Sequence, residues 1–376
     1  MDFASSTPFT VGLEEELLLV DRDTYELAPV AAEVLAGLDA GESAGHEAYA
    51  AEIELRSSVT AGVAAAVSEL ASLRARAAAV GATLIGAGVH PSGAFGDAPL
   101  VDGERYRVVD GEMRGLIRRT PECALHVHVG MPGFETAIQV FNALRSYLPL
   151  LQGLAANSPW WFGVDSGLAS ARGALVREYP GRGIPRALRD AEDWVQLVEA
   201  VTAAGELRDY TFLWWDIRLH PRLGTVEVRE LDAQSSLDDA AAMAALIRAL
   251  ALEAAKSSAP VEPSETLAWS AFRAMRDGVD AEVLTDGRQR SLRDFARETV
   301  ERIRPLARDL GDEAELDGVE GILRTGGGAG RRRRAFEVGG LRRQLEELAQ
   351  ETAGRERSRL SSGFNRGAAA LAPPSP

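Results

Sequence analysis

The chain has 376 residues, of which 46% are hydrophobic, so it can bury a large core in one big domain or two closely packed ones. Its formal net charge of −15 argues against nucleic acid or an anionic membrane as the main partner, because both attract cationic surfaces. A single cysteine, Cys123, excludes an internal disulfide and any zinc site built from several cysteines. A single lysine, Lys256, excludes a phosphate loop that ends in Gly-Lys-Ser/Thr. No signal-peptide pattern or membrane-length apolar run is present, so we expect a soluble protein of the cytoplasm.

The first predicted element is a strand over residues 11–20 that contains three consecutive glutamates. Side chains alternate across a strand, so Glu14 and Glu16 lie on one face while Leu13 and Glu15 lie on the other. Two carboxylates that face a core would be costly, so this face is either wet or neutralised by a cation. The alternative interpretation is a solvated edge strand that carries a cluster of charges.

A second acidic strand is predicted within residues 47–58, where Glu52 and Glu54 share a face. Before it, residues 26–29 read as a returning strand and residues 31–38 as a short helix. After it, we predict a helix over 62–80, a buried strand over 82–89 and a helix over 104–118. Gly86-x-Gly88 lacks the third glycine of a dinucleotide fingerprint, so no Rossmann fold is expected.

A third strand over residues 123–130 places His126 and His128 on one face. Histidines in a strand are often hydrogen-bonded core residues, but a His-x-His pair among apolar residues equally fits a ligand role. One long amphipathic helix is predicted over 134–154. The basic segment 170–185 reads as a loop, and Arg172 there either contacts a substrate anion or balances nearby glutamates.

Residues 212–219 and 224–232 predict an antiparallel hairpin, and residues 190–203 before it predict a helix. Thr225, Glu227 and Arg229 share a face of the second strand, which suits a metal ligand beside a phosphate-binding group. Helices are predicted for the rest of the chain, followed by a disordered tail. The predicted ranges are helices over 237–257, 266–276, 292–310 and 313–323, a flexible glycine linker over 325–330, a final helix over 331–351 with Arg331 to Arg334 on a solvated face, and a tail over 354–376.

Strands interleaved with helices first and helices last indicate an α+β fold, with an antiparallel sheet whose wet face collects the polar residues of these strands. Several carboxylates with few imidazoles favour Mg²⁺ or Mn²⁺ over structural zinc. Such ions most often bridge nucleotide phosphates in enzymes, which points to ATP-dependent chemistry. The residues on this predicted face are Glu14, Glu16, Glu54, His126, His128, Glu227 and Arg229.

A set of motifs in this order resembles the bacterial carboxylate-amine ligases of the glutamate-cysteine ligase type 2 family, over roughly residues 9–353. They are Val11-Gly-Leu-Glu-Glu-Glu16, Gly88-Val-His-Pro91, Leu125-His-Val-His-Val-Gly130, Ala156-Asn-Ser-Pro159, Trp215-Asp-Ile-Arg218 and Gly224-Thr-Val-Glu-Val-Arg229, followed by Asp232-Ala-Gln234. Together these motifs are specific, although each alone is weak.

The resemblance implies a glutamine-synthetase-like fold, a curved antiparallel sheet with the active site on one face and helices on the other, in a single catalytic domain over 1–353. It also implies ATP-dependent amide formation between a carboxylate, typically the γ-carboxylate of glutamate, and an amine such as that of cysteine. Matched by position, the metal ligands would be Glu14, Glu16, Glu47, Glu54, His126 and Glu227; the catalytic arginines Arg172, Arg218 and Arg229; and the ATP-binding residues Arg218, Arg229 and Asn157.

The chain departs from the family at a few positions, including Glu52 and Ala51, where the family has glutamine and serine. These departures bear on substrate identity more than on reaction type. Besides glutamate-cysteine ligation, two other activities fit: the same chemistry on a peptide or specialised-metabolite carboxylate, and a phosphotransferase of the guanidino-kinase type. The expected partners are a carboxylate and an amine substrate, without nucleic acid or membrane, and a homodimer is compatible with them.

Overall fold

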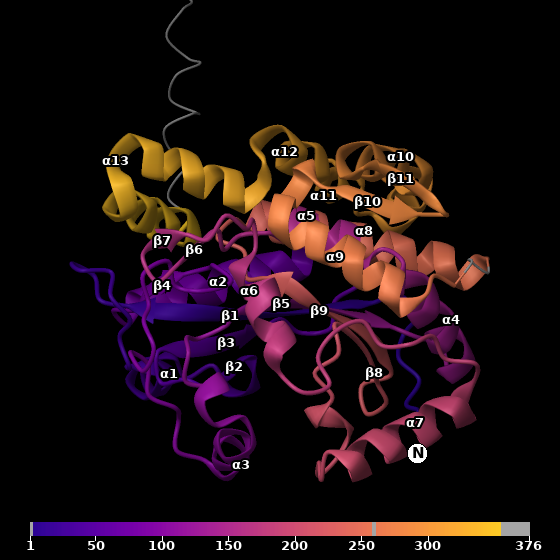
Figure 1. Cartoon of the computed structure of the whole chain (residues 1–376), viewed down its shortest axis with the longest axis horizontal. Coiled ribbons are helices and arrows are strands. Elements are labelled where there is room, and N and C mark those ends of the chain that lie inside the picture. Colours follow the sequence, from indigo (N-terminus) through magenta and orange to yellow (C-terminus); the bar gives the residue numbers. More distant parts are fainter. Residues whose placement is uncertain (1–2, 258–260, 355–376) are drawn as a thin grey trace, which may run out of the picture.

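The computed structural model describes residues 3–257 and 261–354, and a seven-stranded sheet lies at its centre (Figure 1). The strand order is β2-β3-β1-β5-β9-β8, with β4 paired to the end of β1, and every pairing in this sheet is antiparallel. The predicted combination of helices with an antiparallel sheet is therefore confirmed. The strands are β1 (Val11–Val20), β2 (Ala44–His46), β3 (Glu52–Arg56), β4 (Thr83–Ile85), β5 (Ala124–Gly130), β8 (Ile217–His220) and β9 (Thr225–Asp232).

Strand β1 lies in the middle of the sheet, paired with β3 on one side and β5 on the other. Its Leu13, Leu17 and Leu19 are buried in the main core. Glu15 points into the same interior, where its two carboxylate oxygens accept hydrogen bonds of 2.9 and 2.5 Å from Arg74. A buried acid is tolerated there because the guanidinium neutralises it and satisfies both oxygens. The alternative of a solvated edge strand is therefore wrong.

Helices cover the face of the sheet that carries these leucines. The inner layer is formed by α2 (Val63–Ala79), α4 (Phe134–Arg145), α5 (Leu148–Ala155) and α8 (Leu237–Lys256). A second layer packs outside it, at the top of Figure 1, and contains α9 (Ser264–Asp277), α10 (Leu292–Leu310), α11 (Glu313–Leu316), α12 (Gly318–Thr325) and α13 (Gly327–Thr352). The single helix predicted over 134–154 is wrong, because the chain breaks between α4 and α5 and Pro149 lies in the first turn of α5, where a missing N–H costs little.

Several other predicted boundaries differ from the structure. The strand predicted over 82–89 is only β4, and the helix predicted over 104–118 is α3 (Glu104–Met113) followed by a 3-10 turn at Arg114–Leu116. The segment 170–185 is not entirely loop, because it contains α6 (Ala171–Leu175) and a 3-10 turn at Val176–Glu178. The strand predicted over 26–29 is a single bridge between Val20 and Leu27. The remaining elements are α1 (Ala31–Leu38), α7 (Ala191–Ala204), 3-10 turns at Gly41–Ser43, Tyr210–Phe212 and Gly278–Asp280, and two hairpins, β6 (Trp160–Trp161) with β7 (Val164–Asp165) and β10 (Glu282–Thr285) with β11 (Arg288–Ser291).

The predicted glycine linker is wrong, because α12 runs to Thr325 and α13 begins at Gly327. Close packing accounts for glycine there, since a Cβ on Gly328 would overlap the side chain of Asn157. The arginines that follow do not form a solvated face, because Arg332 is buried and pairs with Glu351 at 2.6 Å. Helix α13 is broken at Gly339 and Gly340, whose dihedral angles are not helical. Apart from Gly354, the predicted disordered tail lies outside the described residues.

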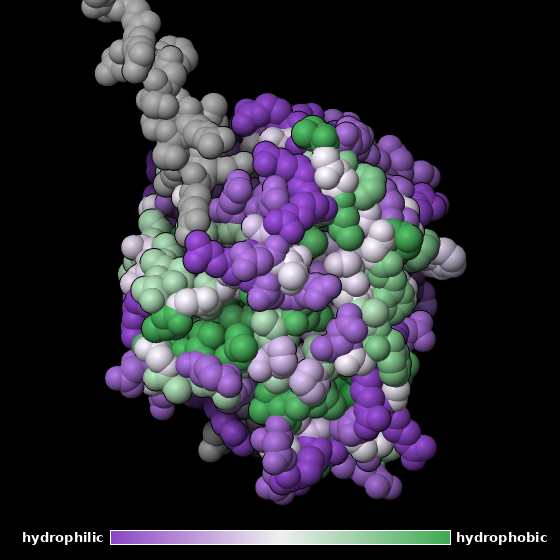
Figure 2. Space-filling model, turned by 90° about the vertical axis from the view of Figure 1, so that its left-hand side faces the viewer, coloured by the Kyte–Doolittle hydropathy of each residue, from purple (hydrophilic) through white to green (hydrophobic). Residues whose placement is uncertain are grey.

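Helix α13 and the β6–β7 hairpin lie side by side, where the rings of Trp160 and Phe336 are 4.7 Å apart (Figure 1). Seen from this side, hydrophobic areas reach the surface between hydrophilic ones (Figure 2). Exposed apolar side chains of these two elements include Val164 and Val338. Within residues 3–257 and 261–354, no helix is long and apolar enough to span a membrane.

Candidate active site

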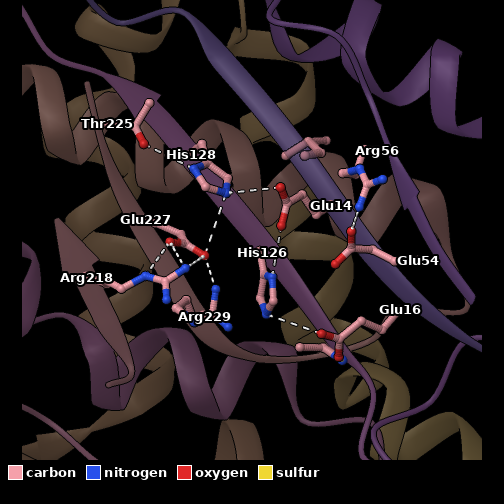
Figure 3. A network of polar contacts seen from close by, with 12 residues as sticks. Glu14, Glu16, Glu54, Arg56, His126, His128, Arg218, Thr225, Glu227 and Arg229 are labelled. Carbon is pink, nitrogen blue, oxygen red and sulfur yellow. Dashed lines mark hydrogen bonds and ion pairs between the residues drawn. The ribbon is translucent and has the colours of Figure 1, made fainter. Parts of the chain in front are cut away.

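The face of the sheet that points away from the inner helix layer carries a band of polar residues across five strands (Figure 3). The register of the strands brings these residues together, because several of them are paired directly across neighbouring strands. The pairs are Glu54 with Glu16 between β3 and β1, Glu14 with His126 between β1 and β5, His128 with Glu227 between β5 and β9, and Arg218 with Glu227 between β8 and β9.

The structure brings the six predicted metal ligands into two groups. The possible ligand atoms of Glu14, His126 and Glu227 lie within 4.8 Å of one another, and so do those of Glu16, Glu47 and Glu54. His126 connects the groups, because its Nδ1 is 3.3 Å from Glu14 Oε2 and its Nε2 is 3.6 Å from Glu16 Oε1. Glu47 comes from the connection between β2 and β3, whereas the other five residues lie on strands of the sheet.

Like charges and burial perturb the second group. Desolvation and then repulsion from Glu16 and Glu54 raise the pKa of Glu47 well above its usual range. Desolvation, followed by repulsion from Glu14, raises the pKa of Glu54 to about 7, although Arg56 pairs with it. A protein that holds three carboxylates so close needs protons or a cation to offset their repulsion.

Positive charges from the protein balance the first group. Burial opposes ionisation of Glu227, but Arg229 and then Arg218 outweigh it and hold the pKa of this carboxyl well below its usual range. Arg218 donates to both oxygens of Glu227, at 2.9 and 3.2 Å, and Arg229 pairs with the same carboxylate. Burial likewise opposes ionisation of Glu14, but the charge of His128 and the hydrogen bonds from His126 and His128 overcome it, so the pKa of Glu14 is also lowered.

These residues fit one or more hard divalent cations. Five carboxylates and one imidazole form the donor set, which suits Mg²⁺ or Mn²⁺ better than softer metals. His128 Nε2 is buried without a hydrogen-bond partner among the described residues, 3.5 Å from Glu14 Oε1 and 3.6 Å from Glu227 Oε1. A cation near these two carboxylates would give that nitrogen a partner.

Three connected spaces surround the band. The central cavity lies over it and is lined by three histidines, His126, His128 and His220, by four of the carboxylates and by three arginines, Arg105, Arg218 and Arg229. The side pocket shares Glu47, Arg105, His126 and Arg229 with the central cavity, and is further lined by Arg172, Arg182, Glu52, Glu122 and an apolar wall that includes Met113, Tyr179 and Trp214. The outer groove begins at Glu14, His128 and Thr225 and continues along Gly12, Val59 and Leu223.

The predicted residues Arg172 and Asn157 have different positions. Arg172 lines the side pocket, and its Nη1 donates to the Glu230 carbonyl at 2.9 Å. Asn157 lines none of these three spaces, because its Nδ2 donates to the carbonyl oxygens of Gly86 and Ala233 at 2.9 and 2.8 Å. The structure therefore does not bring Asn157 to the polar band.

Asp232 is a buried carboxylate that joins the turns around Asn157 and Arg172. Its Oδ2 accepts from the Asn157 N–H at 2.9 Å and from Ser158 Oγ at 2.7 Å, and its Oδ1 accepts from Ser170 Oγ at 2.9 Å. Ser170 in turn caps the helix that carries Arg172. The hydrogen bonds of Asp232 thus fix the position of Arg172 in the side pocket.

Sequence reasoning missed several residues around these spaces. A register shift between β5 and β9 places two residues of β9, Arg229 and Glu230, opposite one of β5, so the strict alternation assumed for β9 ends there. Arg105 comes from α3 and gives no sequence signal that separates it from a surface arginine. Glu52, in contrast, was detectable from its place on the second acidic strand, and Arg182 from the basic segment that also contains Arg172.

Solved structures share this fold. The glutamate-cysteine ligase from Francisella tularensis in complex with AMP aligns with a TM-score of 0.73 and 16% identity, covering 95% of this chain and 90% of that one. A bifunctional glutathione synthetase from Pasteurella multocida aligns with a TM-score of 0.68 and 16% identity, covering 94% of this chain and 53% of that one. The fold is thus one found in ligases.

The sequence then defines the family. The model of glutamate-cysteine ligase family 2 (GCS2) matches residues 10–353, so the chain belongs to this family. A relative in Rubrobacter xylanophilus, named "Putative glutamate--cysteine ligase 2-3", is 42% identical over 363 residues, which cover 93% of this chain and 99% of the relative. The resemblance drawn from the motifs is confirmed.

Proposed function

We propose that the chain is an ATP-dependent carboxylate-amine ligase that joins the γ-carboxylate of glutamate, or of a closely related compound, to an amine such as that of cysteine. The observation that carries the proposal is the polar band, in which two groups of oxygen-rich ligands adjoin Arg218 and Arg229. This is the donor set that phosphoryl transfer needs, namely cation ligands beside fixed guanidinium groups. Family membership and the AMP-bound structural neighbour support the same activity.

The six carboxylate and imidazole residues of the band would hold Mg²⁺ or Mn²⁺. Such a cation would offset the negative charge of the ATP phosphates. We place the acyl substrate in the side pocket, where Arg172 and Arg182 offer positive charge. We place the nucleotide in the outer groove, whose apolar residues Val59 and Leu223 suit a base and which opens onto Glu14 and His128.

In the proposed first step, a carboxylate oxygen of the acyl substrate attacks the γ-phosphorus of ATP, the bond to the bridging oxygen breaks, and ADP leaves. Arg229 lines both the central cavity and the side pocket, so its guanidinium can stabilise the charge that develops on the transferred group. In the second step, the amine nitrogen attacks the acyl carbon, the bond from that carbon to the phosphate oxygen breaks, and the amine loses a proton.

No protein nucleophile takes part in this scheme. Cys123 is the residue most easily mistaken for one, but it is fully buried and its Sγ donates to Glu52 Oε1 at 2.8 Å. Burial and then the charges of Glu52 and Glu16 raise the pKa of this thiol well above its usual value, which disfavours the reactive thiolate.

The decisive experiment is a screen for ADP release from ATP in the presence of Mg²⁺, with L-glutamate and a panel of amines, and with products identified by mass spectrometry. We expect ADP release to require both a carboxylate and an amine, and the product mass to equal their sum less one water. ADP release that is independent of any amine, with a stable phosphorylated product, would instead mean a phosphotransferase.

A further inference from the structure

Glu52 is a buried carboxylate in the side pocket, and no cationic side chain among the described residues pairs with it. Its side chain is 2% exposed, and the hydrogen bond that its Oε1 accepts from the Cys123 thiol is a weak one. Three other acids, Glu16, Glu47 and Glu122, line the same pocket. A buried carboxylate in such surroundings is costly unless a cation reaches it.

Two observations indicate that this cation is not a metal ion. Glu52 is absent from both groups of clustered ligand atoms, although Glu54, its neighbour but one, belongs to the second group. The side pocket is also partly apolar, because Met113, Tyr179 and Trp214 line it. An organic cation with a short carbon chain fits such a wall better than a hydrated metal ion does.

The arginines of the same pocket indicate a second charged group on the ligand. Arg172 and Arg182 both line it, and the Nε of each is buried without a hydrogen-bond partner among the described residues. Guanidinium groups so placed recognise a carboxylate. A ligand that pairs with both Glu52 and the two arginines therefore carries an ammonium group and a carboxylate. It also carries a second carboxylate, which reacts near Glu16 and Glu47.

We propose that Glu52 binds the α-ammonium group of an amino dicarboxylic acid, and that it thereby makes the enzyme select this amino acid over the analogue without the amine. The inference rests on the proposed function, because it takes the side pocket as the site of the acyl substrate. The reacting carboxylate faces the metal ligands, the second carboxylate faces Arg172 and Arg182, and the ammonium donates to Glu52. A charge-assisted hydrogen bond of this kind is far stronger than the bond from the thiol.

The test compares binding of L-glutamate and glutarate by calorimetry, with Mg²⁺ and a non-hydrolysable ATP analogue present. Glutarate has both carboxylates but no amine. We expect wild-type protein to bind L-glutamate at least about tenfold more tightly, because losing one partner of a buried charge pair costs that much or more. In Glu52→Gln, which keeps the shape and removes the charge, the preference should fall to about twofold or less, with glutarate affinity unchanged.

Two further variants sharpen the test. Glu52→Asp keeps the charge on a shorter side chain and should keep part of the preference. Glu178→Gln removes a charge from an exposed glutamate that does not line the pocket, and this variant should keep the full preference for L-glutamate over glutarate.

Equal binding of L-glutamate and glutarate by wild-type protein would overturn the inference, and this comparison needs no variant to fold. An unchanged preference in Glu52→Gln would overturn it too, as would a loss confined to Mg²⁺ affinity. Since binding needs no turnover, these outcomes are separate from the amine-dependent ADP release that tests the proposed function.

Discussion

Replacing Arg229 by lysine separates catalysis from stability at the polar band. Lysine keeps the charge but loses the planar fork of the guanidinium, which can bind two oxygens at once. Glu227 keeps two hydrogen bonds from Arg218, so the loss of stability should be limited to about 1.5–3 kcal/mol, the usual contribution of one hydrogen bond to a charged group. If Arg229 stabilises the transferred phosphoryl group, kcat should fall by about 10² to 10³, which corresponds to about 3–4 kcal/mol.

The assay measures kcat and KM for ADP release together with the melting temperature of the same preparation. Arg186→Lys is the matched control, because Arg186 also holds a carboxylate with two hydrogen bonds, to Asp193 at 2.8 Å each, but lies outside the three spaces of the site. The control should retain normal kcat. Near-normal kcat in Arg229→Lys, combined with a lowered melting temperature, would refute the catalytic role and leave Arg229 as a structural partner of Glu227.

Three further predictions concern other parts of the site. Mg²⁺ should raise the melting temperature of wild-type protein, and EDTA should abolish its activity. Glu54→Gln should reduce both the stabilisation by Mg²⁺ and the metal-dependent activity; if neither is reduced, Glu54 is not a metal ligand. Asp232→Ala leaves three buried donors without an acceptor, so we expect about 3 kcal/mol lower stability and, through displaced Arg172, a raised KM for the carboxylate; an unchanged KM would separate Asp232 from the site. Desolvation raises the pKa of Glu122 from 4.5 to about 7, so its protonated form favours folding and stability is lost as pH rises through that window. The melting temperature of Glu122→Gln relative to wild type should therefore increase between about pH 5 and 8, and a constant difference would contradict the shift.

The faces of polar residues on the regular strands were predictable from the sequence, because strand periodicity fixes them locally. Alternation alone placed Glu14 and Glu16 together, and likewise His126 and His128. Which residues meet across strands depends on register, which the sequence did not provide. Glu47 entered the prediction only through the family resemblance, because it precedes β3 and follows no period.

The failures have equally local causes. A β-bulge interrupts the alternation of β9, so Glu230 could not be placed from its position in the strand. Gly327 and Gly328 resemble a flexible linker in sequence, yet they begin α13. Gly328 is needed because Asn157 fills the space of a side chain there, and Gly327 because its φ is positive. Asn157 illustrates the limit of motifs, since a polar residue in a recognisable turn can serve backbone hydrogen bonding as well as a ligand.

The central claim, ligation through an acyl phosphate, is tested most directly with a substrate whose reacting carboxylate carries ¹⁸O. Because a carboxylate oxygen attacks the γ-phosphorus and later leaves with phosphate, the inorganic phosphate should contain one ¹⁸O for each amide formed, and only when ATP and amine are both present. Unlabelled phosphate, with all label retained in the amide or the unreacted acid, would contradict the account.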